Sequence, residues 1–362
     1  MDRDVLRKRI MAIRRQLNKR NINCLLLTKP VNVTYATGFL GDDSWAVIAK
    51  GRVYLLTDSR YTEQAQGECP HCTIIQRTAP LPEALAKLVK KLKSIRTVTV
   101  EKSASIEDFE QIKKAVKSRL KSAANIIETL RSIKDGSEVA AIKAAASIAA
   151  KALKRTLPHI KAGITENQLA GLLDFQIRKL GATSSFETIV AFGPNASRPH
   201  HKPTTRKLKR KDTILIDFGA KYKGYCSDIT RCFVLGSPTR LYKKACDVVQ
   251  QAHAAAIKMV KAGVNMVQVD AAAREVICKN DLPVYGHGTG HGFGLEIHEL
   301  PYLKPESKGK LKAGQIITIE PGVYIPGKVG ARTEDDILVT ENGCEILTRN
   351  CPHLQLLGQV KN

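Results

Sequence analysis

The chain has 362 residues, of which 43% are hydrophobic and 25% are charged. This length exceeds what one compact core usually serves, and the composition excludes a disordered protein, so two folded domains are expected. The formal net charge is +24; residues 1–130 hold 24 basic and 13 acidic side chains, an excess of +11, which leaves +13 for the rest. A charge dispersed in this way is typical of a basic surface, and nucleic acid is not expected as a partner.

The first 20 residues are predicted to form an amphipathic helix, because apolar residues recur at helical spacing from Val5 to Leu17. Eight basic side chains lie among them, and no apolar stretch of signal-peptide length follows. A later apolar segment, 139–153, is interrupted by Lys143 and Lys151 and is shorter than the about 20 residues of a membrane span, so none is expected. The nine cysteines, an odd number, indicate reduced thiols and a cytoplasmic location.

The first third of the chain is predicted to be a small α/β domain. Short apolar runs indicate strands at 24–28, 45–49, 53–57 and 97–101, with a helix at 81–93. The segment Lys134-Asp135-Gly136-Ser137 then breaks the pattern, and Ser137 is a candidate N-cap for a long helix. We therefore predict one domain over residues 1–130 and a second over 131–362.

The second domain contains an internal repeat. Ile160-Lys161-Ala162-Gly163 precedes a helix that opens with a capping-box pattern at Thr165 and Gln168. One hundred residues later, Val260-Lys261-Ala262-Gly263 again precedes a helix, predicted at 267–279. In each half two helices come before strands, which indicates an α+β domain with pseudo-twofold αα-ββ halves and a site between the halves.

Two aspartates flank a predicted hairpin turn at 221–224. With the turn centred between Tyr222 and Lys223, Asp217 and Asp228 stand directly opposite each other on one face. Two carboxylates at that separation repel each other unless a cation lies between them. Asp217 also follows the apolar run Ile214-Leu215-Ile216, so it is not expected on the surface. The pair is interpreted as half of a metal site.

A glycine ladder at 286–294 carries two more candidates. Glycine alternates with larger residues, so in an extended chain His287 and His291 share one face and the bare face allows close packing or substrate approach. His298 follows seven residues after His291, and Glu299 is next to it. Two histidines in such a ladder indicate a ligand set rather than isolated core histidines.

Acidic residues at the ends of two further predicted strands complete the set. Glu320 follows Ile316-Ile317-Thr318-Ile319, and Glu334 shares a strand face with Arg332. Four carboxylates carry the charge that two divalent cations neutralise, and a set rich in oxygen suits Mn²⁺ or a similar ion better than a structural zinc. We expect two divalent ions, with Co²⁺, Fe²⁺ and Zn²⁺ as the other candidates.

The order of these five residues in the chain resembles the metal-ligand set of the M24 superfamily, which includes methionine aminopeptidase, aminopeptidase P and prolidase and has the pita-bread fold. The matching positions are Asp217, Asp228, His291, Glu320 and Glu334. The resemblance covers the whole second domain. Residues 35–39 and 58–61 also resemble the N-terminal domain of aminopeptidase P, prolidase and creatinase.

The resemblance implies a role for each residue. Asp228 and Glu334 bridge both metals, Asp217 completes one ion, and His291 with Glu320 completes the other. Glu320 also accepts a proton from the attacking water, and His298 stabilises the tetrahedral intermediate. His200 matches the family histidine near the scissile nitrogen, and His287 matches the one on the leaving-residue side. Further assignments are Arg332 as a catalytic residue, and Phe293 with His287 as part of an apolar wall.

The function predicted from this resemblance is an Xaa-Pro aminopeptidase acting on peptides with proline in second position, as a homodimer. Xaa-Pro dipeptidase is the near alternative and a creatinase-like amidinohydrolase a distant one. Methionine aminopeptidase is disfavoured because its chains typically lack the extra N-terminal domain. A binding protein on the same fold remains a candidate from another class, although such relatives have usually lost metal ligands. The motif Cys69-Pro70-His71-Cys72 is not expected to be functional, because it precedes a predicted strand and has no second cysteine pair nearby.

Overall fold

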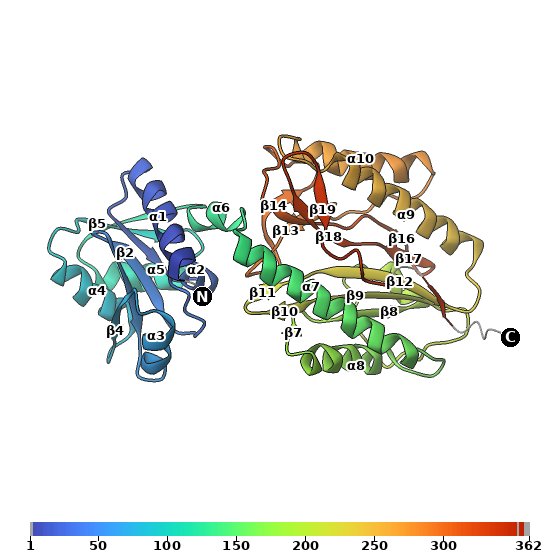
Figure 1. Cartoon of the computed structure of the whole chain (residues 1–362), viewed down its shortest axis with the longest axis horizontal. Coiled ribbons are helices and arrows are strands. Elements are labelled where there is room, and N and C mark those ends of the chain that lie inside the picture. Colours follow the sequence, from blue (N-terminus) through green and yellow to red (C-terminus); the bar gives the residue numbers. More distant parts are fainter. Residues whose placement is uncertain (1–2, 353–354, 358–362) are drawn as a thin grey trace. The chain divides into compact units, whose positions relative to one another are not determined.

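The computed structural model describes residues 3–352 and 355–357. The chain divides into two compact units, Met1–Arg131 and Ser132–Asn362 (Figure 1). The division lies one residue after the boundary expected from the sequence. No helix in the described part of the chain combines the length and the apolar character that crossing a bilayer requires.

The first unit contains helices and one six-stranded sheet, whose strands lie side by side in the order β4-β3-β2-β1-β5-β6. Its strands are β1 (Cys24–Leu27), β2 (Trp45–Ala49), β3 (Arg52–Thr57), β4 (Thr73–Gln76), β5 (Thr97–Glu101) and β6 (Arg119–Ala123). Its helices are α1 (Arg3–Lys19), α2 (Pro30–Thr37), α3 (Thr62–Glu68), α4 (Leu81–Lys91), α5 (Ile106–Ala115) and α6 (Ile127–Arg131). Both faces of the central strand β1 are buried, as in a covered α/β sheet. The cysteine motif lies between α3 and β4, so it does not open a helix.

The second unit contains two pairs of long helices. They are α7 (Gly136–Thr156) with α8 (Glu166–Lys179), and α9 (Arg240–Met259) with α10 (Met266–Lys279). The remaining elements before α9 are η1 (Leu157–His159), β7 (Thr183–Ser184), β8 (Ile189–Phe192), η2 (Gly193–Ser197), β9 (Thr213–Phe218), β10 (Ala220–Tyr222), β11 (Tyr225–Cys226) and β12 (Ile229–Leu235). After α10 follow β13 (Gly290–Gly292), β14 (Glu299–Leu303), β15 (Ile316–Ile319), β16 (Gly322–Ile325), β17 (Val329–Arg332), β18 (Asp335–Val339), β19 (Cys344–Ile346) and β20 (Gln355–Leu357).

The strands of the second unit lie between the two helix pairs (Figure 1). One sheet has the order β20-β12-β9-β8 and another the order β14-β13-β15-β18-β19. One apolar core joins α7 and α8 to β8, β9 and β12, and a second joins α9 and α10 to the later strands. Two helix pairs that enclose the strands are the pita-bread arrangement predicted from the sequence.

The repeat seen in the sequence is a repeat in the structure. Gly163 and Gly263 both have a positive φ, 93° and 86°, and precede the second helix of each pair. The amide of Gly163 donates to the carbonyl of Leu208, and the amide of Gly263 donates to that of Leu311. The capping box of Thr165 is formed as predicted. In each half, the turn before the second helix is therefore bonded in the same way to the segment that leads into a strand, β9 or β15.

The cap of α7 differs from the prediction. Asp135, not Ser137, is the N-cap, and its carboxylate accepts from the amides of Ser137 and Glu138. The Glu138 side chain accepts in turn from the amide of Asp135, which completes a capping box. A carboxylate at the N-terminus also interacts favourably with the helix dipole, which explains why the acid takes this position.

Candidate active site

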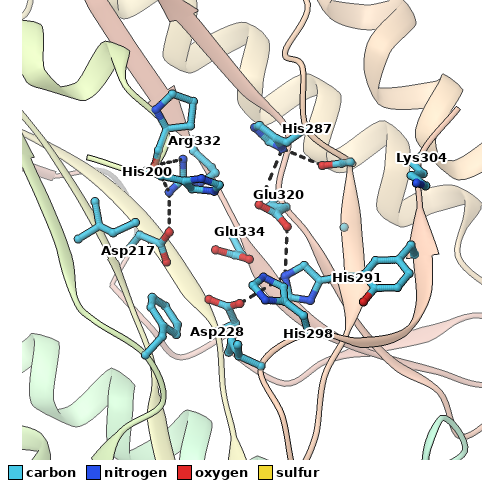
Figure 2. A pocket seen from close by; sticks show the side chains of 17 residues that line it. His200, Asp217, Asp228, His287, His291, His298, Lys304, Glu320, Arg332 and Glu334 are labelled. Atoms are coloured by element: carbon cyan, nitrogen blue, oxygen red, sulfur yellow. Dashed lines mark hydrogen bonds and ion pairs between the residues drawn. The ribbon is translucent and has the colours of Figure 1, made fainter. Parts of the chain in front are cut away.

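A cavity of about 310 Å³ lies among the strands of the second unit (Figure 2). Its lining comes from both halves of the repeat. The residues are Phe186, Ile189, Pro199, His200, Asp217, Asp228, His287, Gly288, Gly290, His291, Ile297, His298, Tyr302, Lys304, Glu320, Arg332 and Glu334. All nine residues assigned a catalytic or metal-binding role from the sequence are among them. Phe293 is not, because it is fully buried in the protein interior; Phe186 and Ile189 provide apolar lining instead.

Strand alternation directs Asp217 into this cavity. Ile214, Ile216 and Phe218 pack in the core beneath α7 and α8, so the residues between them face the opposite side of β9. Leu215 meets the second core there. Asp217, the next residue on that side, lines the cavity and is 9% exposed. The apolar run that precedes Asp217 therefore fixes where its carboxylate points.

The register of this hairpin differs from the prediction by two residues. Asp217 is paired with Thr230 across β9 and β12, not with Asp228. The turn centres on Lys223 and Gly224, which both have positive φ values, 49° and 86°. Such a turn needs φ above zero at both central positions, and glycine meets this need without strain. A slip of two residues preserves the face, so Asp228 still reaches the cavity, diagonal to Asp217.

Asp228, His291 and Glu334 form a group with the spacing of metal ligands. One donor atom from each lies within 4.8 Å of the other two. Nε2 of His291 is 3.6 Å from Oδ2 of Asp228 and 3.4 Å from Oε1 of Glu320. The five side chains proposed as ligands from the sequence thus line one cavity and point toward a common centre in Figure 2.

The carboxylates of this group repel one another. Burial, and then the charges of Glu334, Asp217 and Glu320, raise the pKa of Asp228 well above its ordinary value. The pKa of Glu334 is raised well above its ordinary value by burial and by Glu320 and Asp217. Oδ1 of Asp217 is buried and has no hydrogen-bond partner among the described residues. Buried carboxylates that face one another with an unused acceptor fit a bound cation.

Glu320 occupies a different environment at the end of β15. Burial raises its pKa, while His287 and Arg332 oppose the increase. Its Oε1 accepts from Thr318 at 3.2 Å, and its Oε2 lies 4.0 Å from Nδ1 of His287. A carboxyl group with a raised pKa is suited to accept a proton near neutral pH.

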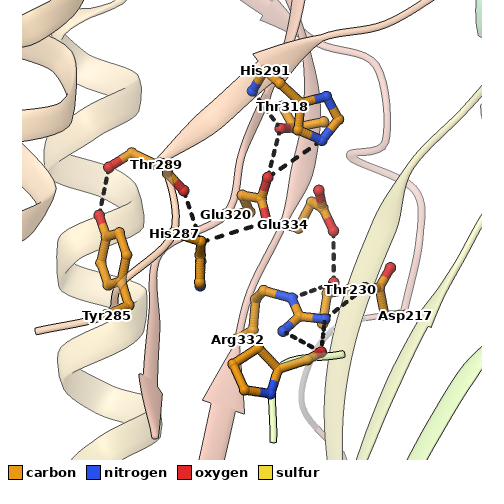
Figure 3. A network of polar contacts seen from close by, with 12 residues as sticks. Asp217, Thr230, Tyr285, His287, Thr289, His291, Thr318, Glu320, Arg332 and Glu334 are labelled. Atoms are coloured by element: carbon orange, nitrogen blue, oxygen red, sulfur yellow. Dashed lines mark hydrogen bonds and ion pairs between the residues drawn. The ribbon is translucent and has the colours of Figure 1, made fainter. Parts of the chain in front are cut away.

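Arg332 holds the other side of the group (Figure 3). Its guanidinium donates to Oδ2 of Asp217 at 2.5 Å and to Oγ1 of Thr230 at 3.0 Å. Thr230 in turn donates to Oε2 of Glu334 at 2.6 Å. Arg332 therefore orients Asp217 directly and Glu334 through Thr230, and its charge offsets part of their repulsion. Nη1 of Arg332 also donates to the Tyr324 hydroxyl at 2.7 Å.

The histidines surround this centre at three places. The ring of His298 lies edge-on to that of His291, with centroids 4.5 Å apart. Nε2 of His287 is 3.1 Å from the Tyr324 hydroxyl. His200 lines the cavity beside Pro199, whereas the adjacent His201 is buried against Glu166, 2.9 Å away, and points elsewhere. Burial lowers the pKa of His287 and of His298, which favours the neutral form of both rings.

Close packing of the backbone requires two glycines of the ladder, Gly290 and Gly292. A Cβ atom on Gly290 would lie 1.9 Å from the carbonyl oxygen of Thr318, and one on Gly292 would lie 2.2 Å from that of Leu300. No side chain fits at these distances. The alternation seen in the sequence thus lets β13 approach its neighbours closely enough for His291 to reach Asp228 and Glu320.

Several residues of the site carry no signal that the sequence reasoning used. Thr230 and Tyr324 connect Arg332 to Glu334 and to His287, but a threonine and a tyrosine in strands are unremarkable in sequence. Asp336 accepts from the amide of Asp228 at 3.2 Å and fixes the backbone of that residue. Lys304 lines the cavity and is exposed to solvent. Its position next to a glycine-lined pocket appears only when β13 and β14 are paired.

The fold and the site define a pita-bread metallopeptidase preceded by a creatinase-type domain. The sequence profile of metallopeptidase family M24 matches residues 140–341, and that of the creatinase/prolidase N-terminal domain matches residues 9–133. The chain belongs to metallopeptidase family M24.

Relatives match over almost the whole chain. An uncharacterized peptidase of Bacillus subtilis (strain 168), YqhT, is 36% identical over 96% of this chain and 100% of its own length. An Xaa-Pro dipeptidase from Bacillus anthracis has a TM-score of 0.93 and 36% identity, covering 97% of this chain and 100% of that one. An X-Pro aminopeptidase from Thermotoga maritima MSB8 has a TM-score of 0.88 and 35% identity, covering 95% and 100%.

Proposed function

We propose that this protein is a metal-dependent exopeptidase that hydrolyses the Xaa-Pro bond, with Xaa-Pro dipeptides as its preferred substrates. The observation that carries the peptidase assignment is the group of carboxylates and one imidazole that lines a single cavity. The preference for dipeptides departs from the aminopeptidase expected from the sequence. It rests on the ammonium group of a lysine that lines the same cavity.

Asp217, Asp228, His291, Glu320 and Glu334 would hold two divalent ions, for which Mn²⁺ stays the predicted identity. Ions bound there supply Lewis-acid polarisation of the peptide carbonyl and acidify water. The unpartnered oxygen of Asp217 and the mutual repulsion of Asp228 and Glu334 support this assignment. The homodimer and the cytoplasmic location likewise stay predictions from the sequence.

The remaining residues move or hold protons. Glu320 accepts the proton of the attacking water, since burial raises its pKa above the ordinary value and makes the carboxylate a stronger base. His298, whose pKa is lowered by burial, donates an N–H to the carbonyl oxygen as negative charge develops on it. His200 donates to the nitrogen of the leaving residue. Arg332 keeps the carboxylate of Asp217 in place by the 2.5 Å hydrogen bond.

The proline side of the cavity is the side of His287. An Xaa-Pro bond has no amide hydrogen and has a ring on its nitrogen, so its enzyme needs an apolar concave wall there. The imidazole face of His287 is fixed by the aromatic rings of Tyr285 and Tyr324, which lie 4.8 and 5.6 Å from it between centroids. This aromatic group gives the wall a rigid shape.

Lys304 supports the preference for dipeptides. Of the two Arg or Lys residues that line the cavity, Arg332 is engaged by Asp217, Thr230 and Tyr324. The side chain of Lys304 makes no hydrogen bond or ion pair with the described residues, and it lies on the same side as His287 and His291 (Figure 2). In a dipeptide the proline carboxylate is at that side, where an ammonium group attracts it. A longer peptide has an uncharged amide there.

The test compares three substrates after metal removal and after restoring Mn²⁺ or Co²⁺. We expect no activity without metal, a higher kcat/KM for Xaa-Pro than for Xaa-Pro-Yaa, and little cleavage of Xaa-Ala. A preference for the tripeptide would favour the aminopeptidase, the activity named for the Thermotoga maritima structure. Activity that is independent of metal would reject the mechanism, and a protein inactive with metal would favour the binding-protein alternative.

A further inference from the structure

The segment that carries His287 is fastened to helix α10 by a buried carboxylate. Asp270, 1% exposed, lies on the inner face of α10. Its Oδ1 accepts from the hydroxyl of Thr289 at 2.7 Å and from the amide of Thr289 at 3.2 Å. This aspartate has no role predicted from the sequence and no part in the proposed mechanism. Its contacts nevertheless end two residues from His287.

Arg274, one turn later on α10, holds the other end of the segment. It donates from Nε to Oδ2 of Asp270 at 2.7 Å. Its two terminal nitrogens donate to the carbonyl of Tyr285 at 2.8 Å and to the carbonyl of His287 at 2.6 Å. The planar guanidinium, with donors in a fixed fork, therefore sets the backbone on both sides of residue 286.

The same pair also fixes the ring of His287. The guanidinium of Arg274 lies over the ring of Tyr285, 4.4 Å from its centroid. The Tyr285 hydroxyl is 2.5 Å from Oγ1 of Thr289, and its ring stacks on His287 with an interplanar angle of 28°. The chain of contacts Asp270–Arg274–Tyr285–His287 thus leads from the helix to the substrate wall, and Figure 3 shows its last members.

The first half of the repeat has a comparable arrangement. Glu166, at the start of α8, is fully buried and accepts from the amides of Phe192 and Thr204, one before and one after the segment that carries His200. It also accepts from the side chains of Asn195, His201 and Thr204. In each half, an acid on the second helix fastens the loop that presents a pocket histidine. The occurrence of this arrangement in both halves supports a role in positioning these histidines.

We propose that Asp270 and Arg274 are positioning residues for His287, and that through it they determine how strongly proline is preferred at the leaving side. The proposal rests on the proposed function, because His287 forms the wall for the proline ring. A displacement of about 1 Å at a reacting site can cost about 100-fold in rate. A looser His287 wall should therefore cost proline substrates more than alanine substrates, which use the wall less.

The test uses Arg274→Lys and Asp270→Asn in the full-length protein loaded with Mn²⁺. The readout is the ratio of kcat/KM for an Xaa-Pro substrate to that for the matching Xaa-Ala substrate. We expect each variant to lower this ratio about fivefold or more, and His287→Ala to lower it further. Combining Arg274→Lys with His287→Ala should lower it no more than His287→Ala alone, because the two act through one ring.

Lys279→Ala is the matched control. Lys279 is on the same helix and also pairs with an acid four residues away, Glu275, but at 3.6 Å and exposed to solvent. This variant should keep the wild-type ratio. An unchanged ratio in both Arg274→Lys and Asp270→Asn would overturn the proposal, as would full additivity with His287→Ala.

Amide hydrogen exchange in metal-free protein provides a readout independent of activity. Residues 286–289 should exchange at least tenfold faster in Arg274→Lys and in Asp270→Asn than in Lys279→Ala. Unchanged exchange would show that the segment does not depend on the pair, and the proposal would fail. Wild-type protein that cleaves no Xaa-Pro bond would instead reject the proposed function, while the exchange measurement would still decide whether α10 holds the segment.

Discussion

At the scale of single residues, the proposed metal ligand Asp228 is expected to destabilise the metal-free protein. Its carboxylate is buried beside Glu334, Asp217 and Glu320, and the pKa of Asp228 is raised well above its ordinary value by burial and by these charges. Asp228→Ala removes one repelling charge, so metal-free protein should unfold at the same temperature as the wild type or higher. Mn²⁺ should raise the Tm of the wild type but not of the variant, because binding to the native state stabilises it.

Thermal unfolding with and without Mn²⁺, together with metal content and turnover, checks this prediction. Asp247→Ala, at an exposed position on α9, serves as the control and should behave as the wild type. A normal Mn²⁺-dependent rise in Tm, or wild-type turnover, in Asp228→Ala would contradict the assignment of Asp228 as a ligand.

His298 is predicted to stabilise the transition state and to contribute little to the binding of metal or substrate. It lines the cavity edge-on to His291, and its pKa is lowered by burial, so a neutral ring is available as a donor. His298→Ala should keep metal binding and KM nearly unchanged and lower kcat about 100-fold, the usual effect of losing one such donor. Steady-state kinetics at saturating Mn²⁺ measures this. A kcat within a factor of two of the wild type would remove His298 from the mechanism.

At the scale of elements, a buried ion pair connects β12 to β18. Arg231 and Asp335 are 1% and 3% exposed and lie 2.7 Å apart. Arg231 also donates to the carbonyl of Glu334 at 2.5 Å, next to the proposed ligand side chain. Arg231→Met removes the guanidinium from the buried Asp335, which still has His253 at 3.3 Å and the Thr348 hydroxyl at 2.6 Å. We therefore expect the free energy of unfolding to fall by about 3 kcal/mol, the lower end for a broken buried pair. Urea unfolding of the metal-free protein followed by circular dichroism measures it.

The exposed pair of Lys143 and Glu345 is the comparison. Its atoms are also close, 2.8 Å, but the side chains are 44% and 49% exposed. Lys143→Ala should therefore cost less than about 1 kcal/mol. Equal losses in the two variants would show that burial does not determine the strength of these pairs.

The stability that the Arg231–Asp335 pair contributes depends on pH, and the direction of this dependence follows from the direction in which the pKa of Asp335 is shifted. Burial alone would raise the pKa of Asp335, but Arg231 and then His253 hold it below its ordinary value. A carboxyl with a lowered folded pKa contributes stability above its ordinary pKa and loses it as the pH falls through the folded value. The difference between the wild type and Arg231→Met should therefore be largest near neutral pH and shrink on acidification.

Elements were predicted better than the contacts that align them. The strands 45–49 and 97–101 have the predicted bounds, because an apolar run between turn residues defines a strand locally. The hairpin register did not follow from the sequence, because it depends on which residues take positive φ; Lys223 does so beside Gly224. The N-cap at Asp135 instead of Ser137 is a similar choice between neighbouring acceptors.

The five proposed metal ligands could be selected from the sequence, but the residues that position the site could not. Asp217, Asp228, His291, Glu320 and Glu334 could be selected because acids and histidines next to buried strands are unusual. Positioning residues are on other elements, as Asp270 is on α10, and look like ordinary residues of an amphipathic helix. Only the tertiary arrangement shows that Asp270 lies 2.7 Å from the hydroxyl of Thr289.

At the scale of the whole molecule, the second unit is predicted to bind metal in the absence of the first unit. The 17 residues that line the cavity all lie between positions 186 and 334, within the second unit. The first unit has its own apolar core beneath its six-stranded sheet. Residues 132–362 expressed alone should therefore fold and show a rise in Tm with Mn²⁺, as domains with separate cores do. The same fragment with Asp228→Ala is the control and should show no rise. A folded fragment that lacks the Mn²⁺ response, while the full-length protein has it, would show that the first unit contributes to the metal centre.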